Sequence, residues 1–129
     1  MQRLLLAGAG VTLVLHGLIH LMGTTVYAGW GDVQGLPYKT TLLGGRWKVG
    51  EKGMRLFGEL WLVPMVGFVV LGAALAFNGP VSTAALALTT VASLVLTLLD
   101  WDRAFAGAAV DGAILVALGT APHWMGVLR

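Results

Sequence analysis

The chain lacks cysteine and is poor in charge. None of its 129 residues is cysteine, 57% are hydrophobic and only 11% are charged, whereas a soluble domain carries about 25% charged residues. Without thiols the chain can form no disulfide, no thiolate metal site and no cysteine redox pair. The net charge of +2 comes from a few loop cations, so no nucleic-acid partner is expected.

Three motifs of soluble enzymes are also missing: a phosphate-binding P-loop, a serine nucleophile elbow and a Gly-rich dinucleotide turn. Their absence excludes ATP-driven and classical hydrolase functions as far as motifs decide them. The chain has instead four apolar runs of about the 17 to 25 residues that cross roughly 30 Å of hydrocarbon, at residues 4–22, 54–77, 81–99 and 104–120. They predict an all-α fold, an integral membrane up-down four-helix bundle that forms a single domain over residues 1–129.

Two short links set the expected helix order. Asn78-Gly79-Pro80 suits a tight turn, because Asn and Gly tolerate turn conformations and Pro begins a helix. Trp101-Asp102-Arg103 is an equally short link. Helices joined so closely must be neighbours, which favours the up-down order. Pro64 removes one backbone hydrogen bond and predicts a kink in the second span.

The cations predict the orientation. The long first loop, residues 23–53, carries Lys39, Arg46, Lys48 and Lys52, whereas the opposite side has only Arg3, Arg129 and the terminal amine. Cytoplasmic loops carry an excess of Lys and Arg. We therefore expect a multi-pass protein of the cell membrane with both termini outside.

Aromatic residues in the first loop leave two interpretations open. Trp30, Tyr38 and Trp47 indicate a segment that lies against the lipid headgroups. Such a segment caps the bundle in one interpretation and is an aromatic belt anchor in the other.

Five ionisable residues lie inside or at the edges of the expected spans: His16, His20, Glu59, Asp100 and Asp111. At about 1.5 Å of rise per residue, all lie within about 10 Å of the side that carries the first loop. Charge in hydrocarbon costs at least about 2.5 to 3.5 kcal/mol per group, so such residues are rare unless they are paired or used. The sequence therefore predicts one polar layer inside the bundle.

Small and polar residues at helical spacing support this layer. They form two stripes, Gly8, Thr12, His16 and His20 on the first span and Thr90, Ser93, Thr97 and Asp100 on the third. Stripes of this kind belong on helix-helix contacts and not against lipid. We also expect close packing at Gly58, Gly67 and Gly107.

The layer supplies candidates for acid-base chemistry. A histidine and a carboxylate in a water-poor pocket suit proton transfer, so the catalytic candidates are His16, His20, Glu59 and Asp111. The substrate-binding candidates near the same boundary are Arg55, Trp61, Trp101 and Asp100.

Each of these residues also has a plainer interpretation. His16 and His20, one turn apart, suit a metal ion, but they equally suit hydrogen bonds to a neighbouring helix. Glu59 has Arg55 one turn earlier as an ion-pair partner. Asp111 has no cation within a turn on its own helix, so it must find a histidine or stay protonated.

Three short sequence stretches carry a family resemblance: residues 16–23 (HGLIHLMG), 50–62 (GEKGMRLFGELWL) and 99–107 (LDWDRAFAG). Together they resemble small four-span bacterial membrane proteins of DoxX-like appearance. The resemblance implies a four-helix membrane fold and a bacterial origin, but no reaction. The cysteine-dependent redox chemistry of some neighbouring four-helix bundles does not transfer to a chain without cysteine.

Three functions fit these patterns. The first is an acid-base enzyme acting on a lipophilic small molecule by isomerisation, epoxide opening or cyclisation; a metal would indicate hydrolysis or oxidation instead. The second is a non-catalytic accessory or binding subunit of a larger membrane complex. The third, a transporter or proton-conducting unit, requires a homo-oligomer because four short spans show no inverted repeat. Membrane lipid is an expected partner in all three.

Overall fold

The structure is a computed structural model that describes residues 1–124, with the side chains of residues 1–120. Its elements are α1 (Gln2–Tyr27), β1 (Thr41–Leu42), a short 3-10 helix (Leu43–Gly45), β2 (Trp47–Lys48), α2 (Gly50–Leu60), α3 (Leu62–Ala76), α4 (Thr83–Leu99) and α5 (Trp101–Trp124). The all-α prediction is confirmed, apart from a small antiparallel hairpin of β1 and β2 that the sequence did not predict. Arg129 lies outside the described residues.

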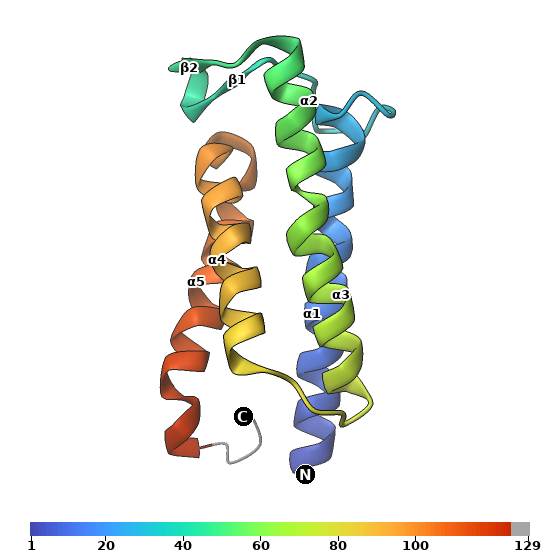
Figure 1. Ribbon diagram of the computed structural model, residues 1–129, viewed down its shortest axis with the longest axis vertical. Helices are drawn as coiled ribbons and strands as arrows, with labels where there is room; N and C mark the ends of the chain where they lie inside the picture. Colours follow the sequence, from blue (N-terminus) through green and yellow to red (C-terminus); the bar gives the residue numbers. More distant parts are fainter. Residues whose placement is uncertain (125–129) are drawn as a thin grey trace.

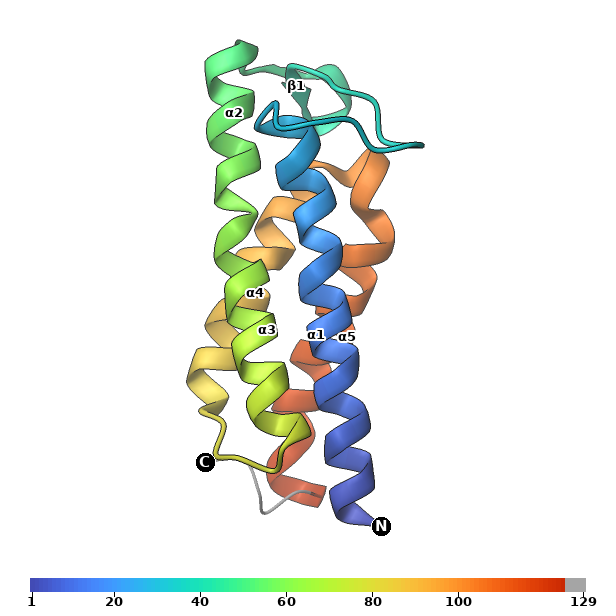
Figure 2. The same ribbon diagram turned by 90° about the vertical axis from the view of Figure 1, so that its right-hand side faces the viewer.

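The helices form two pairs. α1 lies along α2 and α3, and α4 lies along α5, with further contacts between α3 and α4 (Figure 1). The N-terminus and the link between α3 and α4 lie at one end of the molecule, and the first loop lies at the other (Figure 2). The helices therefore follow the predicted up-down order.

Among the described residues, three helical segments are long and apolar enough to cross a membrane: Gln2–Tyr27, Gly50–Ala76 and Trp101–Thr120. α4 is also apolar but has 17 residues. The four apolar runs of the sequence thus correspond to the helices, although α1 continues beyond residue 22 to Tyr27.

Glycines make the contact between α1 and α3. A Cβ added to Gly10 would lie 2.5 Å from the Gly72 oxygen, and a Cβ added to Gly17 would lie 2.9 Å from the Cβ of Phe68. The two backbones therefore approach as closely as in the small-residue interfaces of membrane helices.

The glycine face of α1 corrects one of the predicted stripes. His16 and His20 are buried as expected, but Gly8 and Thr12 are exposed. The glycine face turns toward α3, and Thr12 instead lines an open cavity. The close-packing prediction holds at Gly58, where an added Cβ would lie 2.4 Å from the backbone nitrogen of Ala28.

Pro64 interrupts the second span, as predicted. α2 ends at Leu60 and α3 begins at Leu62, with Trp61 between them. Proline has no N–H, and its ring displaces the carbonyl four residues earlier, which here belongs to Leu60. The break occurs where the Trp61 side chain enters the core.

The link between α3 and α4 is the predicted turn. Asn78 adopts a φ of 57°, in the left-handed region that Asn tolerates. Ser82 then caps α4, because its Oγ accepts a hydrogen bond of 3.2 Å from the Ala85 backbone N–H.

The link between α4 and α5 is shorter than predicted. Asp100 alone separates the two helices, and Trp101–Arg103 form the first turn of α5 instead of a loop. The N–H groups of Arg103 and Ala104 both bond to the Asp100 carbonyl, which closes this turn. Ala104 then leaves helical geometry (φ −118°, ψ 18°), so α5 is kinked where the predicted span begins.

The buried apolar side chains of residues 1–120 form two clusters. One contains Val26, Tyr27, Leu42, Met54, Phe57, Trp61 and Leu96, and the other contains Leu6, Leu13, Phe68, Leu75, Val81 and Leu86. On α1, His16 and His20 lie between them. Leu42 is only 2% exposed, so the first loop caps the bundle, whereas Trp30 and Trp47 in the same loop are exposed, as in an aromatic belt.

Candidate functional site

A buried hydrogen-bonded network joins α1 to α4 and α5. It comprises His16, His20, Ser93, Thr97 and Asp111, which we call the polar network. His16 Nε2 lies 2.8 Å from Asp111 Oδ1, while Ser93 Oγ lies 2.6 Å from Asp111 Oδ2 and 2.7 Å from His20 Nε2. Thr97 Oγ1 lies 3.4 Å from the same Oδ2. All five residues are buried. Of the five residues of the predicted polar layer, the network contains His16, His20 and Asp111, and Asp111 bonds to a histidine.

Helical spacing and one glycine position these groups. His16 and His20 lie one turn apart on α1, and His20 Nδ1 also bonds to the His16 carbonyl at 2.8 Å. Gly107 lies one turn before Asp111 on α5, and a Cβ added there would be 3.1 Å from the Thr97 methyl carbon. The missing side chain lets α5 approach α4 closely enough for Asp111 to reach the α4 hydroxyl groups.

Aromatic rings enclose the histidines. The His16 ring centroid lies 4.9 Å from that of Phe68, and the His20 centroid lies 5.2 Å from that of Trp61. Gly23 gives the Trp61 ring room, since a Cβ there would lie 3.0 Å from it. Trp61 Nε1 is buried with no hydrogen-bond partner among the described residues. Hydrogen bonds in such apolar surroundings are electrostatically stronger than in water.

An apolar cavity of about 750 Å³ opens toward the terminal end of the molecule. It is lined by Met1, Gln2, Leu5, Leu6, Ala9, Thr12, Leu13, Leu75, Leu86, Ile114, Ala117 and Leu118. Leu13 is one helical turn from His16, and Ile114 is one turn from Asp111, on the same faces of their helices. The inner end of this cavity therefore approaches the polar network.

A second buried acid lies at the loop end. Tyr27 donates a hydrogen bond of 2.6 Å to Asp100, and Lys39 binds both Asp100 and Asp102, the latter at 3.1 Å. Burial raises the pKa of the Asp100 carboxyl above its usual value, while the hydrogen bonds from Lys39 and Tyr27 oppose that shift. Because Lys39 belongs to the first loop, these bonds tie the loop to the helix ends.

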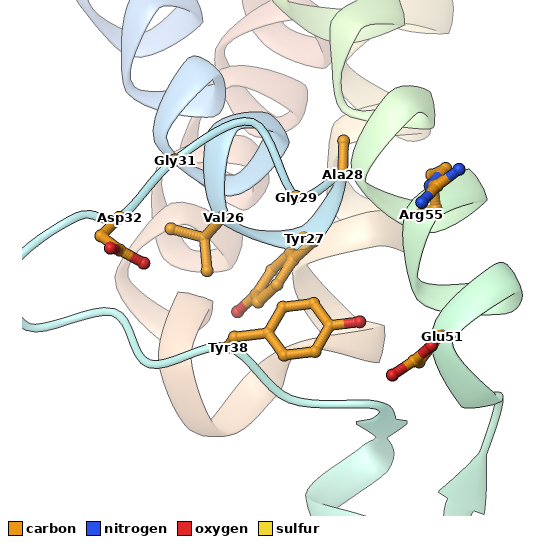
Figure 3. Close-up of a pocket in the computed structure, with 9 residues that line it drawn as sticks. All are labelled: Val26, Tyr27, Ala28, Gly29, Gly31, Asp32, Tyr38, Glu51 and Arg55. Carbon is orange, nitrogen blue, oxygen red and sulfur yellow. The ribbon is translucent and has the colours of Figure 1, made fainter.

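A smaller pocket of about 370 Å³ lies beside this second acid. It is lined by Val26, Tyr27, Ala28, Gly29, Gly31, Asp32, Tyr38, Glu51 and Arg55 (Figure 3). Figure 3 shows Arg55 and Glu51 on its α2 side and Asp32 on its loop side. Arg55, a predicted substrate-binding residue, thus lies here and not at the polar network.

Glu59 does not join the polar network. It is exposed on α2, and among the described residues it forms no ion pair with Arg55 or any other cation. α2 packs through Met54, Phe57 and Gly58, which leaves position 59 on the outer face. The expectation that it would share the layer of the histidines is wrong for this reason.

The remaining candidates are scattered. Trp61 packs against His20 inside the core, whereas Trp101 is 55% exposed. Asp100 belongs to the loop-end cluster with Tyr27.

The two histidines turn their ring nitrogens toward different partners. His16 Nε2 meets Asp111, while His20 uses its two nitrogens for the His16 carbonyl and Ser93. The rings are almost perpendicular, with an interplanar angle of 88°. No group of three or more metal-ligating side chains occurs in the part of the chain that the structure describes. The hydrogen-bonding alternative is therefore the one that the geometry shows.

Sequence reasoning missed the role of two residues. Ser93 stands at the centre of the polar network, although it was expected only as a member of a helix-contact stripe. The stripe itself was the available signal, since Thr90, Ser93, Thr97 and Asp100 are all buried. Lys39 was expected to set topology, and no local pattern indicates its contact with Asp100, 61 residues away.

Comparison of the chain with protein families, curated proteins and solved structures gives no match. The DoxX-like resemblance therefore stays a prediction, and the function must be argued from the site itself.

Proposed function

We propose that the chain is an integral membrane protein whose first loop lies on the cytoplasmic side. Large apolar side chains cover the outer faces of the helices, and Leu15, Ile19, Val66, Val70 and Val91 are each 46 to 59% exposed. Exposed apolar area of this extent is unfavourable in water. In a bilayer the same surface contacts acyl chains, while the helices satisfy their own backbone groups.

The function we propose inside that membrane is acid-base catalysis on a lipophilic small molecule. One observation carries the proposal: the buried His16–Asp111 pair lies one turn from the inner end of the apolar cavity. Small-molecule sites are typically apolar concavities of about 300 to 1,000 Å³ with a few convergent polar groups. The cavity has the volume and lining for a lipophile, and the pair has the chemistry.

His16 is the group we assign to contact the substrate. It is the most exposed member of the polar network, at 7%, whereas Asp111 is completely buried. Asp111 orients the His16 ring by its hydrogen bond and stabilises the imidazolium that forms when His16 takes a proton, as the aspartate does in other His-Asp pairs. The reactions that need only such proton transfer are isomerisation, epoxide opening and cyclisation.

Occupancy of the cavity tests the binding half of the proposal. Ala117 lines the cavity, so that Ala117→Trp places a large ring in it, whereas Ala109 is an equally exposed alanine of the same helix that does not line the cavity. Native mass spectrometry and organic extraction of the purified protein should find a copurifying lipophile in the parent and in Ala109→Trp. It should be absent from Ala117→Trp. Equal occupancy in all three proteins would contradict the proposed site.

Turnover tests the catalytic half. Once the copurifying molecule is identified, the parent protein should convert it or release its product, and His16→Gln should bind it without converting it. General acid-base groups contribute about 10²- to 10⁴-fold in rate. A His16→Gln protein with full activity would leave a binding function only.

A second candidate is an accessory subunit, favoured by the way the polar network links the two helix pairs. Buried polar groups that are all bonded fix helix register without any chemistry. This role predicts that Ala117→Trp has no functional effect and that changes at Asp111 alter stability alone.

A further inference from the structure

The hydrogen bonds of His20 fix the position of one proton. A carbonyl oxygen can only accept, so the 2.8 Å contact with the His16 carbonyl requires a hydrogen on His20 Nδ1. In a neutral His20 the other nitrogen, Nε2, is then an acceptor. That nitrogen faces Ser93 Oγ at 2.7 Å.

The next two contacts need one more proton than an ionised Asp111, the Ser93 hydroxyl and a neutral His20 supply. Asp111 Oδ2, Ser93 Oγ and His20 Nε2 form two consecutive links of 2.6 and 2.7 Å, and each link requires its own hydrogen. The Ser93 hydroxyl has only one. If Asp111 were a carboxylate and His20 neutral, one link would bring two lone pairs together.

We propose that a single mobile proton occupies this chain, resting on Asp111 Oδ2 and passing through Ser93 to His20. In the resting state Asp111 donates to Ser93, and Ser93 donates to His20 Nε2. His16 donates its own Nε2 hydrogen to Asp111 Oδ1, so all four groups are neutral and every contact carries a hydrogen. Neutral groups suit a buried site, because burying charge is costly.

The transfer is balanced. Asp111 loses its proton to the Ser93 oxygen while the Ser93 hydrogen passes to His20 Nε2. Asp111 becomes a carboxylate, His20 becomes an imidazolium, and Ser93 is again a neutral hydroxyl. The hydrogen bonds are the same in number before and after, with their directions reversed.

Ser93 is therefore a positioning residue, because it relays the proton between Asp111 and His20. The catalytic use of the chain rests on the function proposed above: passing its proton to His20 turns Asp111 into a carboxylate, which stabilises His16 when His16 Nδ1 takes a proton from the substrate. The protonation state itself is a property of the resting protein and needs no substrate. The two ideas can consequently fail separately.

Infrared spectroscopy of the full-length protein labelled with carboxyl-¹³C aspartate tests the resting state. At neutral pH we expect a carboxylic-acid C=O band that shifts with the label and disappears in Asp111→Asn. It should remain in Asp100→Asn, which removes the other buried acid. A parent spectrum in which Asp111 contributes only carboxylate bands would overturn the proposal.

Nitrogen NMR of ¹⁵N-histidine-labelled protein tests the role of Ser93. We expect His20 as the neutral Nδ1–H tautomer, with an Nε2 resonance displaced by the hydrogen bond that it accepts. Ser93→Ala should remove that displacement. Thr90→Val, which deletes a buried hydroxyl that bonds to the Leu86 carbonyl on the same helix, should preserve it. An unchanged Nε2 resonance in Ser93→Ala, or an Nε2–H form of His20 in the parent, would contradict the assignment. The second outcome is measured on the parent protein, so it does not depend on the folding of any variant.

Discussion

His16 on α1 and Asp111 on α5 are joined by a 2.8 Å hydrogen bond although 95 residues separate them in the chain. The bond crosses from one helix pair to the other, next to an apolar cavity that leaves the terminal ends of these helices apart. A contact in this position both fixes the helices and sets the end of the cavity. Stability and the proposed function therefore depend on the same atoms.

Two substitutions of Asp111 should distinguish the contribution of its side-chain shape to stability from that of its hydrogen bonds. Asp111→Leu leaves the His16 Nε2–H without its acceptor and the Ser93 oxygen without its donor, and we expect it to lower the free energy of unfolding by about 3 kcal/mol. Asp111→Asn retains an acceptor and should cost about 1 kcal/mol. Unfolding in detergent by titration with a denaturing surfactant measures both, with Val110→Ala as an exposed neighbouring control. Equal stability of the Leu variant and the parent would show that the network contributes nothing to the fold.

Glycine substitutions should reveal the close contact of α1 with α3. Gly10→Ala places a Cβ 2.4 Å from the Ala76 nitrogen, a backbone atom that can move only with its helix. We expect a loss of roughly 1 to 3 kcal/mol, as in overpacked cores. Gly8→Ala meets nothing within 4 Å and should stabilise α1 by up to about 1 kcal/mol through helix propensity. Similar melting temperatures for the two variants would contradict this packing.

Hydropathy and turn residues were enough to predict the helical fold. The four apolar runs and the Asn78-Gly79-Pro80 turn rest on local physics, which acts within a helix or a link. The kink at Pro64 was predictable for the same reason. The hairpin of β1 and β2 was not, because two-residue strands leave no periodic pattern.

The sequence predicted a contact in the site only where the depth of two residues in the helix bundle was enough to bring them together. Asp111 had no local cation, so it had to meet a residue from another helix, and His16 was at the same depth. Glu59 was expected at the same depth, but it lies on the outer face of α2. The packing of Phe57 and Gly58 sets the rotation of α2 about its axis, and the sequence does not predict that rotation. Lys39 lies in an aperiodic loop, where sequence patterns give no contact information.

Labelling of single cysteines should establish the proposed membrane topology. The chain has no native cysteine, so Gln2→Cys, Phe77→Cys, Gln34→Cys and Lys48→Cys each report one exposed position. A membrane-impermeant thiol reagent added to intact cells should react with positions 2 and 77 and spare positions 34 and 48. Permeabilised cells provide the control for reactivity. Labelling of all four positions in intact cells would rule out the up-down arrangement across a bilayer.

Asp100 should make stability depend on pH in a defined direction. Burial raises its pKa in the folded protein above the value of about 3.9 that an unfolded chain shows. The folded state then binds a proton in a range where the unfolded state has lost it. The stability that this linkage contributes is fully present below pH 3.9 or so and is lost as pH rises through the raised pKa.

Comparison with Asp100→Asn isolates that contribution, because all other titrating groups are shared. We expect the parent to lose stability relative to the Asn variant as pH rises from about 4, until Asp100 is fully ionised. Lys39→Gln should extend the loss to higher pH, because it removes a hydrogen bond that favours the carboxylate. Thermal unfolding in detergent at a series of pH values gives these differences. If the parent instead gains stability relative to Asp100→Asn over the same range, the Lys39 and Tyr27 hydrogen bonds outweigh burial and the pKa of Asp100 is lowered.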